Sequence, residues 1–361
     1  MYQILTRTQK QFLLVVLWFL VASVLANHAN PHPHTVSGIS SGAFMAVQHH
    51  VAFSSLVTGV GVVAGGPYFC SQGKLPVALT SCTTTPSLIS IPELVTITKA
   101  TALSGYIDAP IHMKDDAVWL FSGTKDTVVD PGVVQKLHAY YTAFGVQNLV
   151  LVDSIAAEHS MPTLNYGSAC AYKGEPYINN CNFDGAGEIL KHVYNTSGAF
   201  RPPTTSIDTN IIEFSQSQFN PSVVNFTTIG MADIGYAYVP KACAADGERL
   251  ISNNTSLGPA SLSTSVLPPP CRLHIAYHGC LQSQAAIGSD YYLHAGYNRW
   301  AEANAIVVVY PQAKKNLFNP KGCWDWWGYS GPEFASNVGA QLFTVRNIVK
   351  RYFDGEENEK H

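Results

Sequence analysis

A serine between small residues is the clearest candidate for chemistry in this sequence. Gly38, Ile39, Ser40, Ser41 and Gly42 form a G-x-S-x-G pentad, which follows a short β-like run and precedes a helix-like one. In such a pentad the glycines allow a very tight turn, and the central hydroxyl projects from it. The pattern predicts that Ser40 is a nucleophile and that the Ser41 amide, at a helix N-terminus, donates to an oxyanion. The alternative is an ordinary flexible turn.

A serine nucleophile needs a base, and the base needs a residue that orients it. Asp126 lies shortly after the apolar run "WLFSG" and is the favoured acid, whereas Asp130 precedes Pro131 and is typical of a helix cap. His159 follows the next apolar run, "NLVLVD", and is the favoured base. The order serine, aspartate, histidine along the chain is that of the α/β-hydrolase triad.

A second candidate oxyanion donor lies far from the pentad in the sequence. His278, Gly279 and Cys280 follow the apolar run "CRLHIAY". An H-G element after a strand commonly supplies an oxyanion amide in α/β-hydrolases, but it then precedes the serine. Because it follows the serine here, we expect a circular permutation and assign this donor to the Cys280 amide. The alternative is that His278 is the base and His159 has no role.

Alternating apolar and amphipathic runs define the elements that must position these residues. Strands are expected near residues 35–38, 58–66, 116–123, 148–153, 271–279 and 305–312, and helices near residues 43–54, 133–144, 185–195, 291–304 and 334–353. Such alternation predicts an α/β fold with a mainly parallel sheet and helices on both faces. The polar stretches 196–232 and 253–270 are expected to be surface connections within one domain.

The composition and the N-terminus are typical of an exported protein. Only 12% of the 361 residues are charged and the net charge is −3, so nothing suggests a nucleic acid or an anionic membrane as partner. Arg7 and Lys10 precede an uncharged run of 15 residues, Phe12–Ala26, which suits a signal peptide better than a membrane span. We expect residues 1–26 to be a cleaved signal peptide, so that no membrane insertion remains; an uncleaved anchor is the alternative.

Eight cysteines agree with export, because disulfides form in oxidising compartments. None of them forms a C-x-x-C pair, so a metal site has little support and none is expected. Sequential pairing is the simplest arrangement. It gives the disulfides Cys70–Cys82, Cys170–Cys181, Cys243–Cys271 and Cys280–Cys323.

Taken together, the motifs resemble those of one enzyme family. The segments "SGISSGAFMAVQ", "AGGPYFC", "SGTKDTVV", "NCNFDGAGEILK", "GYAYVP", "HGCLQS", "YPQA" and "GCWDWWGY" follow one another between Val36 and Tyr352. As a set they resemble the secreted fungal and bacterial poly(3-hydroxybutyrate) depolymerases with a circularly permuted α/β-hydrolase domain. The resemblance implies the same triad and oxyanion amides as above. The sequence departs from the family pattern at Lys125 and Ala43, which we expect to affect only the rim of the site.

The resemblance implies a secreted serine esterase that hydrolyses poly(3-hydroxybutyrate), or a related 3-hydroxyalkanoate polyester and its oligomers, without a cofactor. Trp324, Trp326 and Trp327 in "CWDWWGY" are expected to bind substrate at the mouth of the site, and Trp324 is favoured because it is nearest to Cys323. Residues 27–361 are expected to form one catalytic domain without a separate polymer-binding module, as a monomer. The alternatives are a feruloyl or acetyl-xylan esterase and an inactive polymer-binding protein.

Overall fold

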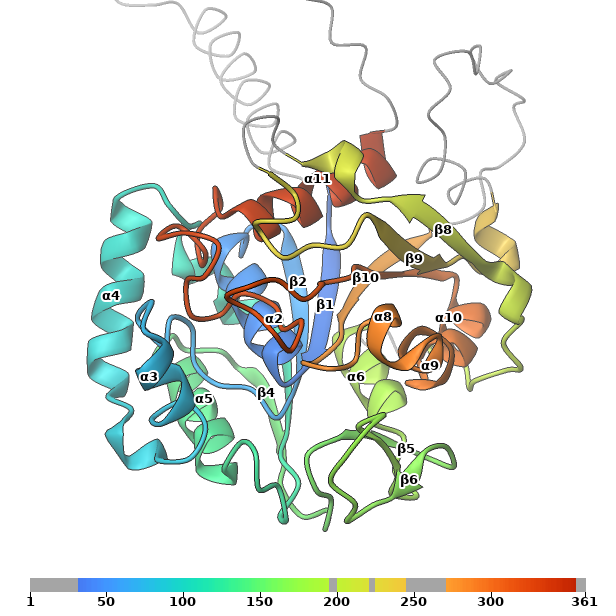
Figure 1. Cartoon of the computed structure of the whole chain (residues 1–361), viewed down its shortest axis with the longest axis horizontal. Helices are drawn as coiled ribbons and strands as arrows, with labels where there is room; N and C mark the ends of the chain where they lie inside the picture. Colours follow the sequence, from blue (N-terminus) through green and yellow to red (C-terminus); the bar gives the residue numbers. More distant parts are fainter. Residues whose placement is uncertain (1–31, 195–199, 221–224, 245–270, 355–361) are drawn as a thin grey trace, which may run out of the picture. The chain divides into compact units, whose positions relative to one another are not determined.

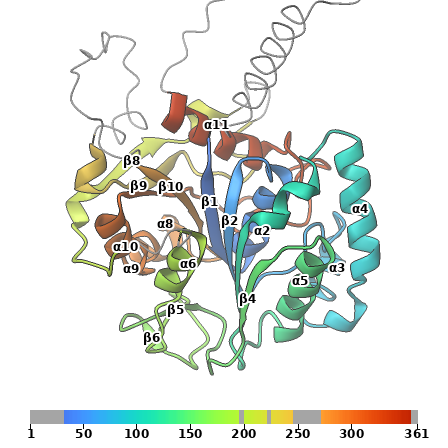
Figure 2. The same ribbon diagram turned by 180° about the vertical axis from the view of Figure 1, so that it is seen from behind.

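One eight-stranded sheet with helices on both faces forms the centre of the molecule. The computed structural model describes residues 32–194, 200–220, 225–244 and 271–354. From Pro33 on, these residues belong to one compact unit, drawn in Figure 1 and, from behind, in Figure 2. The expected signal peptide and the stretch 253–270 lie outside the described residues.

The large sheet contains eight strands in the order β4-β3-β2-β1-β10-β11-β9-β8. Their bounds are His34–Ile39 (β1), Val57–Val63 (β2), Ala117–Phe121 (β3), Asn148–Val152 (β4), Ile211–Ser215 (β8), Ile234–Tyr238 (β9), Arg272–Tyr277 (β10) and Ile306–Tyr310 (β11). Strands β1 to β4, β10 and β11 are parallel, while β9 pairs antiparallel with both β11 and β8. The sheet is therefore mainly parallel, as expected.

The position of β1 shows the expected permutation. This first strand of the described chain lies in the middle of the sheet, with β2, β3 and β4 on one side of it. On its other side are β10, β11, β9 and β8, which all come from later in the chain. The register pairs Gly38 of β1 with Tyr277 of β10, so the segment after β10 starts beside the G-x-S-x-G turn.

Helices cover both faces of the sheet. Helices α2 (Ser41–Ala52), α4 (Ile91–Leu103), α5 (Pro131–Ala143) and α11 (Ala340–Asp354) contribute to one hydrophobic cluster. Helices α6 (Gly185–Tyr194), α9 (Asp290–His294) and α10 (Tyr297–Asn304) contribute to a second cluster. Two cores on opposite faces are what parallel strands require, because such strands are apolar on both sides.

Short elements fill the connections. They are the helices α3 (Leu75–Leu79) and α8 (Gln284–Ile287), the 3-10 turns η1 (Pro86–Leu88), η2 (Pro110–Asp115), η3 (Asp208–Asn210), η4 (Ser217–Phe219) and η5 (Lys241–Cys243), and the strands β5 (Met161–Thr163), β6 (Ser168–Ala169) and β7 (Ile178–Asn180). The last three form a separate small sheet in the order β5-β7-β6. This small sheet follows the segment that carries His159.

Three expectations about elements were wrong in detail. The helix expected over 291–304 is broken at Gly296, whose φ of 102° lies outside the helical region and separates α9 from α10. The helix expected from residue 334 begins only at Ala340. Strand β8 and most of the connection to β9 lie in residues 196–232, where only a surface connection was expected.

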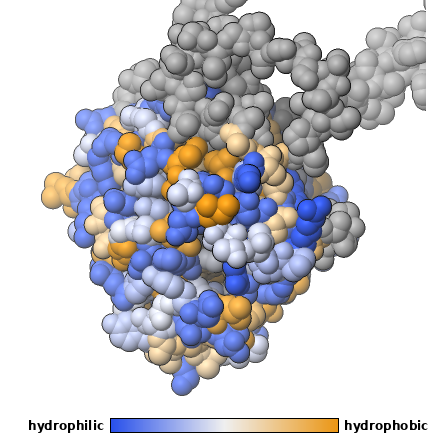
Figure 3. Space-filling view, turned by 90° about the vertical axis from the view of Figure 1, so that its right-hand side faces the viewer, coloured by the Kyte–Doolittle hydropathy of each residue, from blue (hydrophilic) through white to orange (hydrophobic). Residues whose placement is uncertain are grey.

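The surface contains both polar and apolar residues. On the face shown in Figure 3, hydrophobic residues occur in small groups among hydrophilic ones. Such scattering is normal for a folded protein, because polar atoms cannot cover the whole surface. No helix within the described ranges combines the length and the apolar character that crossing a membrane requires.

Candidate active site

Ser40 occupies a strained turn between β1 and α2. Its φ and ψ are 57° and −124°, and a positive φ is unfavourable for a residue with a side chain. The Ser40 amide donates to Val63 O at 2.9 Å, and the Ser40 carbonyl accepts from the amides of Ala43 and Phe44 at 2.9 and 3.0 Å. The end of β2, through Val63, and the first turn of α2 thus hold Ser40 on both sides, which is the geometry of a nucleophile elbow.

Close backbone packing explains the two glycines of the pentad. A Cβ atom on Gly38 would collide with the carbonyl oxygen of Gly42, and one on Gly42 would collide with that of His278. The first contact closes the turn on itself. The second brings the start of α2 against the end of β10, and so places the elbow beside the H-G-C segment.

Asp126 and His159 form a buried hydrogen-bonded pair. His159 Nδ1 lies 2.8 Å from Asp126 Oδ2, and both residues are less than one tenth exposed. Asp126 follows β3 and His159 follows β4, and the two loops are joined by a hydrogen bond from the Thr124 amide to Ile155 O. Because Asp126 engages Nδ1, the other ring nitrogen of His159 is left for a proton transfer.

Backbone amides fix the carboxylate of Asp126. Its Oδ1 accepts hydrogen bonds from the amides of Val128 and Val129, both at 2.9 Å, while Oδ2 faces His159. The competing carboxylate, Asp130, accepts from the Gly132 amide at 2.8 Å and caps α5. The structure therefore brings Asp126, and not Asp130, to the candidate base.

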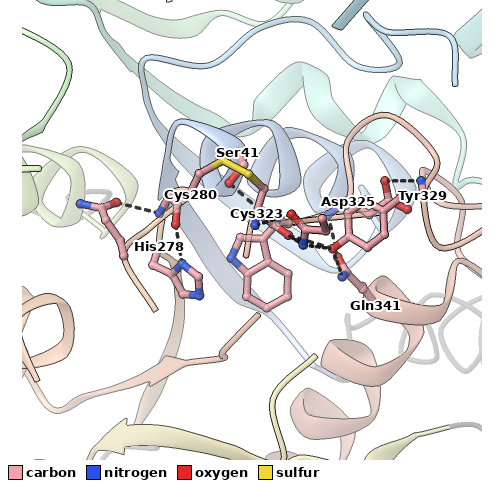
Figure 4. The surroundings of a disulfide bond; sticks show 11 residues. Ser41, His278, Cys280, Cys323, Asp325, Tyr329 and Gln341 are labelled. Carbon is pink, nitrogen blue, oxygen red and sulfur yellow. Dashed lines mark hydrogen bonds between the residues drawn. A yellow bond between two sulfur atoms is a disulfide. The ribbon is translucent and has the colours of Figure 1, made fainter. Parts of the chain in front are cut away.

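The two residues whose amides are predicted to be oxyanion donors line the same cleft. Ser41 is the first residue of α2, and Cys280 follows β10, the neighbour of β1. Neither amide donates a hydrogen bond to another described residue. A disulfide joins Cys280 to Cys323, and Figure 4 shows it close to Ser41. Unpaired amides from two loops are the arrangement that an oxyanion hole needs.

His278, the alternative base, has a structural environment. It is fully buried, and burial lowers its pKa to about 4, so the ring is neutral at neutral pH. Its Nε2 accepts from the Ala313 amide at 3.1 Å, and Nδ1 lies 2.7 Å from Gly279 O. With both nitrogens engaged by the backbone, His278 has no nitrogen free for a serine.

The three tryptophans occupy different environments, and the preference for Trp324 was wrong. Trp324 is fully buried, with its ring packed against Tyr277 and His278 at centroid distances of 5.0 and 5.5 Å. Its amide donates to Ser41 Oγ at 3.3 Å, so this residue supports the elbow from behind. Trp326 and Trp327 instead line the cleft described below.

A cleft of about 550 Å³ contains the candidate groups. Its wall includes Ser40, Ser41, His159, Cys280, Trp326 and Trp327. Most of the remaining wall is apolar and includes Leu75, Leu79 and Phe318. Lys125, where the sequence departs from the family pattern, is exposed and does not line the cleft. Ala43 is fully buried and does not line the cleft either.

All eight cysteines are paired in the arrangement expected from their order. The disulfides are Cys70–Cys82, Cys170–Cys181, Cys243–Cys271 and Cys280–Cys323. The last one ties the candidate oxyanion loop to the loop that carries Trp326 and Trp327. A covalent link between these loops limits their relative motion.

Gln282 connects the two walls of the cleft, a role that the sequence did not predict. Its Oε1 accepts from the Gly279 amide at 2.8 Å, and its Nε2 donates to the carbonyls of Pro176 and Tyr177 at 3.0 and 2.9 Å. The side chain is almost fully buried. Gln282 therefore holds the H-G-C segment against the loop beside His159. The only signal in the sequence was its place in "HGCLQS".

Asp325 shapes the loop that carries the tryptophans, and it was also missed. One carboxylate oxygen accepts from the amides of Trp327, Gly328 and Tyr329, and the other accepts from the amide and hydroxyl of Ser330. Burial raises the pKa of this carboxyl group above its usual value. The five hydrogen bonds fix the position of Trp327 at the wall of the cleft.

Comparisons with known proteins identify the family of the chain. No protein-family model matches the chain. A poly(3-hydroxybutyrate) depolymerase of Delftia acidovorans is 42% identical over 323 residues, which are 89% of this chain and 60% of the relative. A polyhydroxybutyrate depolymerase of Talaromyces funiculosus is 33% identical over 348 residues, which are 91% of this chain and 92% of the relative. The chain belongs to the poly(3-hydroxybutyrate) depolymerase family.

Solved structures of the family share the fold. A PHB depolymerase from Penicillium funiculosum has a TM-score of 0.75 and 31% sequence identity, covering 91% of this chain and 98% of that one. The same values hold for a serine-to-alanine variant of a PHB depolymerase complexed with an R3HB trimer. The chain spans about three fifths of the Delftia acidovorans depolymerase but nearly all of the Talaromyces funiculosus one.

Proposed function

We propose that this chain is a secreted serine esterase that hydrolyses poly(3-hydroxybutyrate) or a related 3-hydroxyalkanoate polyester and its oligomers. The observation that carries the proposal is the convergence of the Ser40 elbow and the Asp126–His159 pair on one apolar cleft. Membership of the depolymerase family supports the choice of substrate. So does the R3HB trimer bound by a structural neighbour.

The proposed mechanism is acyl transfer through the serine. Ser40 Oγ attacks the ester carbonyl, and His159 accepts the serine proton and then delivers it to the leaving alcohol. Asp126 keeps the His159 ring in the tautomer that can accept a proton. The amides of Ser41 and Cys280 stabilise the negative charge on the carbonyl oxygen. Water then attacks the acyl-enzyme in the reverse sequence and releases the acid.

Secretion is supported by the disulfides. Each of the eight cysteines is paired within the described residues. Such pairing is typical of proteins that fold in an oxidising compartment. The expected signal peptide at residues 1–26 would deliver the chain there.

A panel of esters tests the proposed substrate class. We expect the value of kcat/KM for a 3-hydroxybutyrate trimer to exceed those for methyl ferulate and acetylated xylan by at least about tenfold, because binding energy along the cleft is gained only by a matching chain. Faster turnover of the ferulate or the xylan ester would instead place the protein among polysaccharide esterases. Binding of the trimer without turnover of any ester would identify an inactive binding protein.

Trp327 is proposed to contact the chain of the substrate beyond the scissile ester. It is partly exposed on the cleft wall, whereas Trp326 is 7% exposed and stacks on Phe44 at a centroid distance of 4.1 Å. For Trp327→Ala we expect about a tenfold loss of kcat/KM on the hydroxybutyrate trimer, because an aromatic contact is lost. The value for p-nitrophenyl butyrate, which does not extend along the cleft, should stay nearly constant. Equal losses on both substrates would show that Trp327 only packs the loop.

A further inference from the structure

Two lysines, Lys173 and Lys321, lie on the wall of an otherwise uncharged or apolar cleft. Neither forms an ion pair with a carboxylate in the described ranges, and no Asp or Glu is among the described residues that line the cleft. The positive charges of these two lysines have no evident role in binding the uncharged repeating units of a polyester. They would, however, attract an anionic part of a substrate.

Lys173 lies on the side of the cleft that carries the base. It belongs to the loop closed by the Cys170–Cys181 disulfide, and this loop is joined to the histidine segment by a hydrogen bond from the Glu158 amide to Cys170 O. Lys173 Nζ donates a hydrogen bond to Thr127 Oγ1 at 2.8 Å. Thr127 is the residue that follows Asp126 in the sequence. Tyr177 of the same loop lies edge-on to the His159 ring at 6.4 Å.

The chemistry of the polymer determines which group arrives on this side. In a 3-hydroxyacyl ester the acyl part leads toward the hydroxyl end of the chain, and the leaving alcohol belongs to the unit that leads toward the carboxyl end. The base must deliver its proton to that leaving oxygen. The fragment beside His159 is therefore the one that ends in the free carboxylate.

We propose that Lys173 is a specificity-determining residue that binds the terminal carboxylate of a 3-hydroxyalkanoate oligomer and directs cleavage to ester bonds near the carboxyl end. This inference rests on the proposed function. Only one of the three ammonium protons is used by Thr127, so the group can keep that contact and still donate to a carboxylate. Lys321, on the segment next to Cys323, belongs to the opposite wall and is not part of the proposal.

A purely structural role for Lys173 must be separated from this one. Thr127 also donates to the carboxylate of the buried residue Glu158, at 2.8 Å, so Lys173 is linked to that negative charge through one hydroxyl group. If Lys173 only supported Thr127, its loss would disturb the neighbouring Asp126 and slow every ester equally. If it binds a carboxylate, its loss should affect only substrates that have one.

The experiment compares a hydroxybutyrate trimer that has a free carboxylate with the methyl ester of the same trimer. For the unmodified protein in low salt, we expect kcat/KM to be about three- to fivefold higher for the free acid, the range of an exposed charge pair. Lys173→Met should remove this preference by lowering the value for the acid alone. Lys173→Arg, which keeps the charge, should retain most of it. Sodium chloride near 1 M should abolish the preference by screening.

Lys125→Met is the matched control, because Lys125 is an exposed lysine one residue before Asp126 but lies outside the cleft wall. It should leave the preference for the acid unchanged. Equal loss of preference in both variants would mean a diffuse field, and equal slowing of the acid and the methyl ester by Lys173→Met would mean a structural role. Either result overturns the inference. Failure of the unmodified protein to cleave either trimer would instead overturn the proposed function.

Discussion

Replacing Ser40 with alanine is expected to lower kcat by at least about a thousandfold on every ester, with the fold unchanged. The Ser40 hydroxyl would be the group that forms the acyl bond, and it is presented on the cleft wall by the strained turn at φ 57°. The measurement is kcat on p-nitrophenyl butyrate together with the thermal unfolding midpoint.

Ser41→Ala is the matched control for that variant. Ser41 would contribute its backbone amide, which alanine retains, and its hydroxyl only accepts a 3.3 Å hydrogen bond from the Trp324 amide. We expect the loss in kcat to stay below about tenfold. A nearly inactive Ser41→Ala variant beside an active Ser40→Ala variant would show that the wrong serine was assigned.

Replacing Asp126 with asparagine is the second large effect that we expect. Its Oδ2 lies 2.8 Å from His159 Nδ1, and an amide NH₂ in that place favours the tautomer whose other nitrogen carries the proton. The ring can then no longer accept a proton from Ser40. We predict a fall in kcat of about ten-thousandfold, the size of effect that this exchange has in other serine hydrolases.

Asp130→Asn provides the comparison for Asp126→Asn. Asp130 lies four residues further along the same loop and caps α5 through the Gly132 amide. Asparagine is an equally good cap, so both stability and kcat should remain close to those of the unmodified protein. If Asp130→Asn were the inactive variant, the assignment of the acid would have to be reversed.

The sequence was sufficient to place the candidate chemistry because short local signals carry it. The glycines around Ser40 mark a turn too tight for side chains, and apolar runs a few residues before Asp126 and His159 mark the ends of parallel strands. Parallel strands end at the same edge of a sheet, so residues far apart in the chain meet there. The same reasoning located Cys280 and the permutation, which β1 and β10 show as direct neighbours.

The sequence was not sufficient where the outcome depends on packing between distant segments. Trp324, Trp326 and Trp327 look alike in "CWDWWGY", yet Trp324 fills the space behind the elbow while Trp327 reaches the cleft. The position of Trp327 depends on Asp325, whose carboxylate accepts hydrogen bonds from the amides of the following turn. Gln282 was missed for the same reason, since its partners Pro176 and Tyr177 lie about a hundred residues away.

Element boundaries also depended on tertiary context. Strand β8 was not predicted, because the stretch that contains it is rich in proline, threonine and serine. As the edge strand of the sheet, it needs few apolar residues on its solvent-facing side. Helix α4 (Ile91–Leu103) was not among the expected helices, and it contains several β-branched residues, which have a weak helix propensity. Packing against α5 stabilises that helix despite its weak propensity, through buried residues such as Leu94 and Thr98.

The central claim is that a hydroxyalkanoate ester is cleaved through an acyl-enzyme on Ser40. The most direct test is acid quenching during turnover of the hydroxybutyrate trimer, followed by peptide mass spectrometry of the trapped protein. We predict a hydroxybutyryl adduct on the peptide that contains Ser40, with fragment ions that assign it to Ser40 and not Ser41, and no adduct in the Ser40→Ala variant. Steady turnover of the trimer by the Ser40→Ala variant, or an adduct on another residue, would contradict the account.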